Sequence, residues 1–172
     1  MIITLIGPMA SGKSTIGQLL ASELNMPFID TDQWIEAHTG LSVSEIFQTQ
    51  GEATFRNLET QALKALLTQD NLILATGGGI ITTLENHSLL QQHATIIYLK
   101  ITPETQLQRL PNDNTRPLLA TQNKLTTLVQ LQMEREPLYQ ALAQNTINVD
   151  TLNPQEVIAK IIWLMNFTSS IN

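Results

Sequence analysis

The sequence predicts an α/β fold, in which a central sheet of five parallel strands is covered by helices on both faces. Short apolar and β-branched runs alternate along the chain with longer segments of helical periodicity. The first of these runs, Ile2–Ile6, is almost entirely apolar, which is typical of a parallel strand buried on both faces. Strands separated by helices favour parallel pairing within one sheet, with the helices packed against its two faces.

The first part of the chain gives two strands and two helical segments. Ser14–Leu24 repeats apolar residues at helical spacing, and the run "PFID" (Pro27–Asp30) indicates a second strand. The segment Thr31–Gln48 is helical but divided at "TGLS", where Gly40 indicates a stop and Ser42 a new N-cap.

The rest of the chain continues this alternation. A long helix is predicted at Gly51–Thr68, followed by the apolar strands "NLILAT" (Asn71–Thr76) and "ATIIYL" (Ala94–Leu99). The remaining predicted elements are helices at Thr102–Leu110 and Lys124–Gln144, a strand at "TINV" (Thr146–Val149), and a last helix at Pro154–Met165. The turn-rich segment Pro111–Ala120 is long for a connection inside a domain, so we expect a functional lid at about 111–123.

Composition and charge exclude several classes of protein. The 172 residues suit one domain, expected at 1–166 with a tail at 167–172, and 42% hydrophobic residues indicate a globular chain. No apolar run approaches the roughly 18–20 residues that span a membrane, and no signal peptide is evident, so a cytoplasmic protein is expected. The absence of cysteine excludes disulfides and thiol chemistry. A net charge of −6 argues against a broad nucleic-acid-binding surface, but not against a local cationic pocket.

The segment "GPMASGKS", Gly7–Ser14, fits the phosphate-binding pattern G-x-x-x-x-G-K-[ST]. Its glycines allow a tight turn whose amide hydrogens point at phosphate oxygens, and Lys13 is expected to reach the β- and γ-phosphates. Ser14 opens a helix and offers a hydroxyl to Mg²⁺. An ordinary glycine-containing turn is the alternative, but the preceding buried strand and the following helix favour a phosphate loop.

Two further polar motifs follow strands, and all three are expected at one edge of the sheet. The second strand ends in "DTD", where Asp30 is the best candidate for magnesium because the third strand carries no acidic residue, and Asp32 is a candidate for the acceptor substrate. The alternative is a solvated helix start with Asp32 as its N-cap. The third strand ends in "TGGG", whose glycines expose backbone amides to a substrate or form a flexible turn.

The chain has four arginines, and a shared anionic site would explain all of them: Arg56, Arg109, Arg116 and Arg135. For Arg56 the alternative is a surface salt bridge with Glu52 or Glu59, and Arg135 has acidic neighbours that allow the same interpretation.

Aromatic and histidine residues give weaker signals. Trp34 and Phe55 suit a pocket wall or the core equally well, and Trp163 suits the core. The three histidines have no companion at metal-ligand spacing and are expected at the surface, at His38, His87 and His93.

Taken together, these motifs resemble shikimate kinase over nearly the whole chain, from Ile2 to about Met165. The six matching stretches occur in the family's order and approximate spacing: "GPMASGKSTIG", "FIDTDQWIE", "GEATFRNLE", "TGGGI", "NTRPLL" and "REPLY". The resemblance implies a P-loop kinase fold like that of nucleoside monophosphate kinases. It also implies transfer of the ATP γ-phosphate to the 3-hydroxyl of shikimate with one Mg²⁺ ion, by a monomer that has no nucleic-acid or membrane partner.

The resemblance also implies roles for individual residues. Catalysis is implied for Lys13, Asp32 and Arg116, and magnesium binding for Ser14 and Asp30. ATP binding is implied for Gly7, Pro8, Met9, Ala10, Ser11, Gly12, Lys13, Ser14, Thr15, Arg109, Arg116 and Asn153. Substrate binding is implied for Asp32, Arg56, Gly77, Gly78, Gly79 and Arg135. One departure concerns adenine, because "VDTLNP" lacks the basic residues that family members often carry before the Asn-Pro pair.

Three other functions remain as alternatives. A kinase for another hydroxylated acid, such as gluconate, would use the same pair of arginines. A nucleotide-dependent switch is disfavoured because "NKLT" lacks the aspartate of the guanine-reading N-K-x-D motif. A relative that binds without catalysis is disfavoured because no catalytic position is lost.

Overall fold

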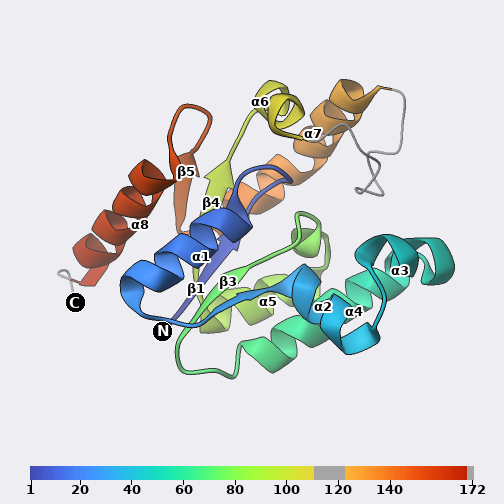
Figure 1. Ribbon diagram of the computed structural model, residues 1–172, viewed down its shortest axis with the longest axis horizontal. Coiled ribbons are helices and arrows are strands. Elements are labelled where there is room, and N and C mark those ends of the chain that lie inside the picture. Colours follow the sequence, from blue (N-terminus) through green and yellow to red (C-terminus); the bar gives the residue numbers. More distant parts are fainter. Residues whose placement is uncertain (111–122, 170–172) are drawn as a thin grey trace.

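The computed structural model describes residues 1–110 and 123–169, with side chains described up to residue 166. Its centre is a sheet of five parallel strands in the order β2-β3-β1-β4-β5, as Figure 1 shows. The strands are β1 (Ile2–Ile6), β2 (Phe28–Asp30), β3 (Leu72–Ala75), β4 (Thr95–Lys100) and β5 (Asn145–Asn148). The predicted fold class and the five predicted strands are confirmed, each within one or two residues.

The helices complete a three-layer arrangement (Figure 1). They are α1 (Lys13–Leu24), α2 (Thr31–Thr39), α3 (Val43–Gln50), α4 (Glu52–Leu66), the 3-10 turn η1 (Ile80–Thr82), α5 (Leu84–His93), α6 (Pro103–Arg109), α7 (Lys124–Leu142) and α8 (Pro154–Ser169). The predicted division between the second and third helices is correct. Gly40 ends α2 in the left-handed conformation, and Ser42 begins α3 with a reciprocal capping box to Glu45.

Two parts of the helical prediction differ from the structure. The elements η1 and α5 are absent from the sequence prediction, because the segment "LENHS" is polar and shows little apolar periodicity. Trp163 was expected in the core but is 62% exposed. The helix α8 packs inward through Val157 and Ile161, and Trp163 lies two residues after Ile161, about 200° around the helix.

Alternate residues of each central strand enter two separate cores. Ile2 and Ile6 of β1 pack with α4, α5 and α7 on one face, whereas Ile3 and Leu5 pack with α1 and α8 on the other. Because both faces of the central strands are buried, these strands have continuous apolar sequences. Among the described residues, no helix is long and apolar enough to cross a membrane.

The strand register brings three carboxyl ends to one edge of the sheet. Ala75, the last residue of β3, lies beside Leu5 of β1 and Asp30 of β2. Thr76 then donates its hydroxyl to the Leu5 carbonyl at 3.1 Å, and the backbone N–H of Gly77 donates to the Thr31 hydroxyl at 3.1 Å. The three sequence motifs that follow these strands are therefore joined by hydrogen bonds.

Candidate active site

The loop between β1 and α1 has the backbone of a phosphate-binding turn. Gly7 and Gly12 adopt positive φ values of 149° and 89°, which side chains rarely tolerate. A Cβ on Gly7 would also lie 2.5 Å from the Leu99 carbonyl oxygen, so this position has no room for one. Ala10 adopts φ 63° although it is not glycine, a conformation that costs about 1–2 kcal/mol.

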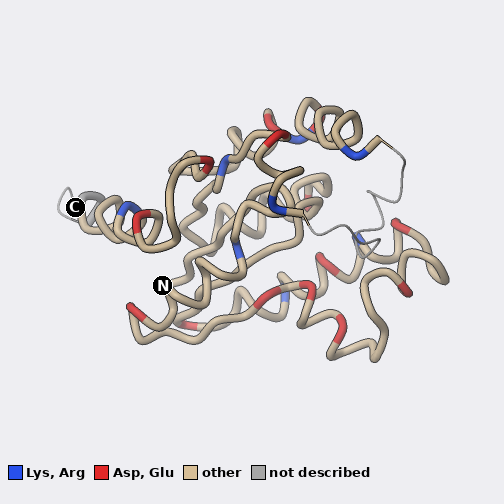
Figure 2. The backbone as a smooth tube through the Cα atoms, turned by 45° about the horizontal axis from the view of Figure 1, so that its top comes forward, with Lys and Arg blue, Asp and Glu red and all other residues tan. Residues whose placement is uncertain are grey.

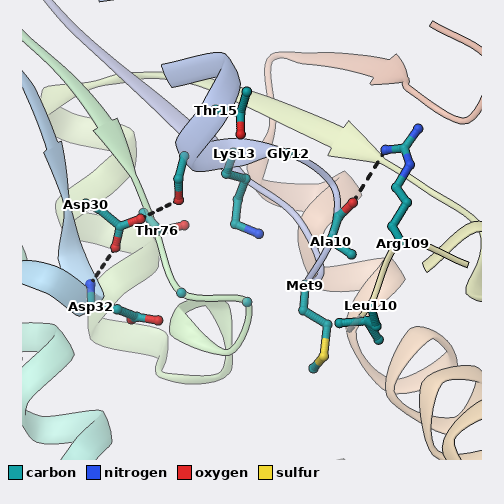
Figure 3. Close-up of a pocket in the computed structure, with 13 residues that line it drawn as sticks. Met9, Ala10, Gly12, Lys13, Thr15, Asp30, Asp32, Thr76, Arg109 and Leu110 are labelled. Carbon is teal, nitrogen blue, oxygen red and sulfur yellow. Dashed lines mark hydrogen bonds between the residues drawn. The ribbon is translucent and has the colours of Figure 1, made fainter. Parts of the chain in front are cut away.

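Side chains from α6 hold the carbonyls on either side of this strained residue. The buried Gln106 donates its amide to the Met9 carbonyl at 3.0 Å. Arg109 donates to the Ala10 carbonyl at 3.4 Å, a contact drawn in Figure 3, and to the Val149 carbonyl at 3.0 Å. Because C=O and N–H point in opposite directions across a trans peptide, fixing the Met9 carbonyl also fixes the direction of the next N–H.

Lys13 lies at the start of α1, with only 9% of its surface exposed. Its ammonium group donates to the Pro8 carbonyl at 2.7 Å and lies 3.4 Å from the Ser11 hydroxyl. In Figure 3 the side chain reaches into the cleft between Asp30 and Asp32 on one side and Met9 on the other.

Asp30 joins the end of β2 to both neighbouring helices. One of its oxygens accepts from the Ser14 hydroxyl at 2.5 Å, and the other accepts from the Asp32 backbone N–H at 2.9 Å. The N-cap of α2 is therefore Asp30. The alternative in which Asp32 serves only as that cap is wrong, because a carboxylate two residues earlier already performs this role, and the Asp32 side chain lines the cleft instead.

These motifs surround one open cleft of about 330 Å³, shown in Figure 3. Its walls come from the phosphate loop, the ends of β2 and β3, and α6. The lining residues are Met9, Ala10, Gly12, Lys13, Ser14, Thr15, Asp30, Asp32, Thr76, Gly77, Gly78, Arg109 and Leu110. The structure thus gathers most of the predicted phosphate-binding residues, Asp32 and two of the predicted substrate-binding glycines, whereas Gly7, Pro8 and Ser11 do not line the cleft.

Next to this cleft, α4 supplies a buried ion pair. Arg56 donates to Glu59 at 2.6 Å and to Glu52 at 3.2 Å, and its side chain is only 14% exposed. Glu59 is fully buried, so the surface interpretation is wrong for the bond to Glu59, whereas Glu52 is 54% exposed and lies at the surface. Burial raises the pKa of Glu59 to about 7 despite the opposing effect of Arg56, and the negative charge of Asp32 raises it further.

The glycines of "TGGG" are packed against these polar side chains. A Cβ on Gly79 would lie 2.3–2.5 Å from three atoms of the Arg56 guanidinium. A Cβ on Gly77 would lie 2.8 Å from an Asp32 oxygen and 2.9 Å from a Glu59 oxygen. The glycines therefore let charged groups approach the backbone closely, which a merely flexible turn would not require.

Arg135 reaches the same region from α7. It is 93% buried, and its charge acts on Glu59 together with that of Arg56, so the two guanidinium groups share one acidic neighbour. One turn further along α7, the Tyr139 hydroxyl donates to the Gly78 carbonyl. Figure 2 shows that Lys and Arg are scattered along the described chain rather than concentrated in one stretch.

The remaining predicted site residues lie further out. Asn153 is exposed, and its side chain accepts from the Glu156 N–H at 2.9 Å at the start of α8. Asp150 in the same segment accepts from the Thr102 N–H at 2.9 Å. Arg116 and nearly all of the predicted lid lie outside the described residues.

The aromatic and histidine predictions have mixed outcomes. Phe55 is buried in the core and Trp34 is partly buried against it, which favours core packing for both. His38 and His93 are exposed as predicted, whereas His87 is half-buried and lies 2.5 Å from the Ile81 carbonyl oxygen.

Sequence reasoning missed three residues of the site. Glu59 was weighed only as a surface partner, although the apolar residues at 55, 62 and 63 place it on the buried face of α4. Tyr139 lies four residues after Arg135, on the same face of α7. Gln106 carries no local signal, because its contact with Met9 joins residues 97 positions apart.

The buried Glu59 makes stability depend on pH. Its pKa in the folded protein exceeds the ordinary value of 4.5, so between about pH 4.5 and pH 7 the folded state holds a proton that the unfolded chain has released. We expect the free energy of unfolding to fall as pH rises through this window, and Glu59→Gln to flatten that fall. Urea unfolding between about pH 5 and pH 8 measures it. Glu85→Gln, at an exposed ion pair, is the control, and equal slopes in wild type and Glu59→Gln would contradict the expectation.

Comparison with known proteins gives a consistent result. A family profile described as "Shikimate kinase" matches residues 9–166. The chain is 42% identical over 171 residues to a shikimate kinase of Thioalkalivibrio sulfidiphilus. The aligned residues cover 98% of this chain and 90% of that protein. It is 43% identical over 160 residues to a shikimate kinase of Legionella pneumophila (strain Corby), covering 93% and 91% of the two chains.

Solved structures of shikimate kinases have the same fold as this chain. The shikimate kinase from Acinetobacter baumannii in complex with shikimate superimposes with a TM-score of 0.94 at 40% identity, covering 97% of this chain and 93% of that one. The shikimate kinase from Aquifex aeolicus gives a TM-score of 0.83 at 34% identity, covering 98% of each chain.

Proposed function

The chain belongs to the shikimate kinase family and is a P-loop kinase, and we propose that it transfers the γ-phosphate of ATP to the 3-hydroxyl of shikimate in the cleft described above. The observation that carries the assignment to this cleft is the meeting of Lys13, Asp32 and the "TGGG" turn in one cavity. A phosphate loop alone would suit any nucleotide-binding protein, whereas a carboxylate and two largely buried arginines near it suit an acceptor that is both hydroxylated and acidic.

The phosphate loop is proposed to hold the ATP phosphates, with Lys13 on the transferring group. Lys13 exchanges its bond to the Pro8 carbonyl for phosphate oxygens when the nucleotide binds. Arg109 is proposed to stack on the adenine, because it joins the phosphate loop to the segment before Asn153. Arg116, in the predicted lid at about 111–123, is proposed to complete the charge around the phosphates.

Ser14 and Asp30 are proposed to hold the magnesium ion. Their oxygens lie 2.5 Å apart beside the phosphate loop, and a hydroxyl with a carboxylate is the all-oxygen donor set that Mg²⁺ prefers. The ion would supply charge stabilisation to the phosphates, and Asp30 is held in place for it by the backbone N–H groups at the start of α2.

The acceptor side is proposed to consist of Asp32, Arg56, Arg135 and the glycine turn. Arg56 and Arg135 bind the carboxylate of shikimate, and the backbone of Gly77–Gly79 binds a ring hydroxyl. Asp32 orients the attacking hydroxyl and accepts its proton as the bond to phosphorus forms.

The test is an assay of ADP release from the purified full-length chain with Mg²⁺ and ATP. We expect release to depend on shikimate and to be abolished by EDTA, with shikimate 3-phosphate as product. Gluconate in place of shikimate tests the nearest alternative, and omission of any acceptor measures background hydrolysis. Release that is equal with gluconate or without an acceptor would contradict the proposed function. Size-exclusion chromatography of the same sample tests the expected monomer.

A further inference from the structure

Tyr139 connects the helix that carries Arg135 to the glycine turn, and the glycine turn in turn lies against Arg56. It lies on α7, one helical turn after Arg135, and is 98% buried. Its hydroxyl donates to the carbonyl of Gly78, and the next residue, Gly79, lies directly against the Arg56 guanidinium. The peptide between Gly78 and Gly79 is therefore held on one side by Tyr139 and on the other by Arg56.

This hydrogen bond also sets the direction of the peptide. Because the peptide unit is planar and trans, a Gly78 carbonyl fixed toward α7 makes the Gly79 N–H point away from Tyr139. Packing alone does not fix Gly78, since a Cβ there would make only ordinary van der Waals contacts, at 3.5–3.6 Å from the Gly7 oxygen, the Met9 nitrogen and the Tyr139 hydroxyl. A glycine turn without this anchor would have more than one peptide orientation available, because glycine restricts its backbone least.

Tyr139 packs against a second buried ring, whose hydroxyl bonds to a different residue. Its ring stacks on Tyr98 of β4, with centroids 4.8 Å apart and planes 17° apart. The Tyr98 hydroxyl donates to Glu136, which also accepts from Lys100 and from Gln140 at 2.6 Å each. Burial raises the pKa of both phenols, so both remain neutral hydrogen-bond donors at any working pH.

We propose that Tyr139 is a positioning residue for the acceptor: its hydroxyl fixes the orientation of the Gly78–Gly79 peptide and the spacing between the Arg135 helix and the Arg56 guanidinium, and thereby determines how tightly the carboxylic acid acceptor binds. This rests on the proposed function. The alternative is that Tyr139, like Tyr98, only fills the core, since both rings belong to the same apolar cluster.

A pair of matched variants distinguishes a positioning role of Tyr139 from a role in core packing alone. Tyr139→Phe and Tyr98→Phe each remove one buried hydroxyl and keep a stacked ring, but only the first releases the Gly78 carbonyl. We expect Tyr139→Phe to raise the KM for shikimate about threefold to tenfold, as expected for the loss of one hydrogen bond, with the KM for ATP within about twofold of wild type. We expect Tyr98→Phe to change neither KM, although both variants lower the melting temperature.

A second readout does not depend on turnover. In thermal unfolding, the stabilisation given by saturating shikimate is expected to shrink in Tyr139→Phe, while that given by ATP stays as in wild type.

Several outcomes would overturn the proposal. Equal rises in both KM values, a KM for shikimate that matches that of Tyr98→Phe, or an undiminished shikimate effect on unfolding would each show that Tyr139 only packs. A wild-type enzyme without shikimate-dependent ADP release would overturn the proposed function itself, and this inference with it.

Discussion

Replacing Asp32 with Asn is expected to lower kcat by about 10²–10⁴-fold, the range associated with a positioned acid–base group. The change keeps the shape of the side chain and the backbone N–H that donates to Asp30, so the start of α2 and the proposed magnesium site remain intact. It removes the negative charge that is proposed to orient the attacking hydroxyl, close to the Gly77 backbone. Steady-state turnover at saturating ATP and shikimate, with ATP binding measured separately, tests this expectation.

The control for Asp32→Asn is Asp70→Asn, which removes an equal charge from an exposed position just before β3. This variant should turn over like the wild type. Wild-type turnover in Asp32→Asn would remove Asp32 from the mechanism, whereas a loss of ATP affinity equal to the loss of turnover would assign it to the nucleotide instead.

Replacing Arg56 with Ala is expected to weaken shikimate binding by roughly tenfold to a hundredfold, because a charge-assisted hydrogen bond contributes about 1.5–3 kcal/mol. ATP affinity should change little, because Arg56 comes from α4 and does not line the phosphate side of the cleft. Calorimetric titration of each ligand separately measures both effects. Unchanged shikimate affinity would show that the carboxylate is bound elsewhere.

Arg56→Ala also removes the cation that is hydrogen-bonded to the buried Glu59, and breaking a buried pair in this way is strongly destabilising. The double variant Arg56→Met with Glu59→Gln avoids the unpaired charge and should show the same loss of shikimate binding in a more stable protein. Lys64→Ala is the matched control on the same helix, because its ion pair with Glu85 is more than half exposed. It should bind both ligands normally.

Features that are determined locally could be predicted from the sequence. The central strands β1 and β3 are buried along their whole length and are therefore almost entirely apolar, and the junction between α2 and α3 uses a glycine stop and a serine cap that local rules recognise. The placement of three motifs at one sheet edge also followed, because parallel strands end on the same side.

Features that depend on the environment in three dimensions could not be predicted. An acidic residue three positions after Arg56 has the same spacing whether it is solvated or buried, so only the packing of α4 distinguishes a surface pair from the buried Glu59. Two aspartates in "DTD" offered two possible caps, and the hydrogen bonds that choose Asp30 come from folded geometry. The contacts of Gln106 and Tyr139 join residues 97 and 61 positions apart, beyond the reach of any local pattern.

The position of Glu59 beside Arg56 affects how acceptor binding depends on pH. With a pKa near 7, this carboxyl is partly protonated around neutrality. The acceptor anion proposed to bind Arg56 would compete with Glu59 for it, and the added negative charge would raise the pKa of Glu59, so binding is expected to take up protons from the solvent. By thermodynamic linkage, the apparent affinity for an acidic acceptor is then expected to decline as the medium becomes more alkaline through neutrality.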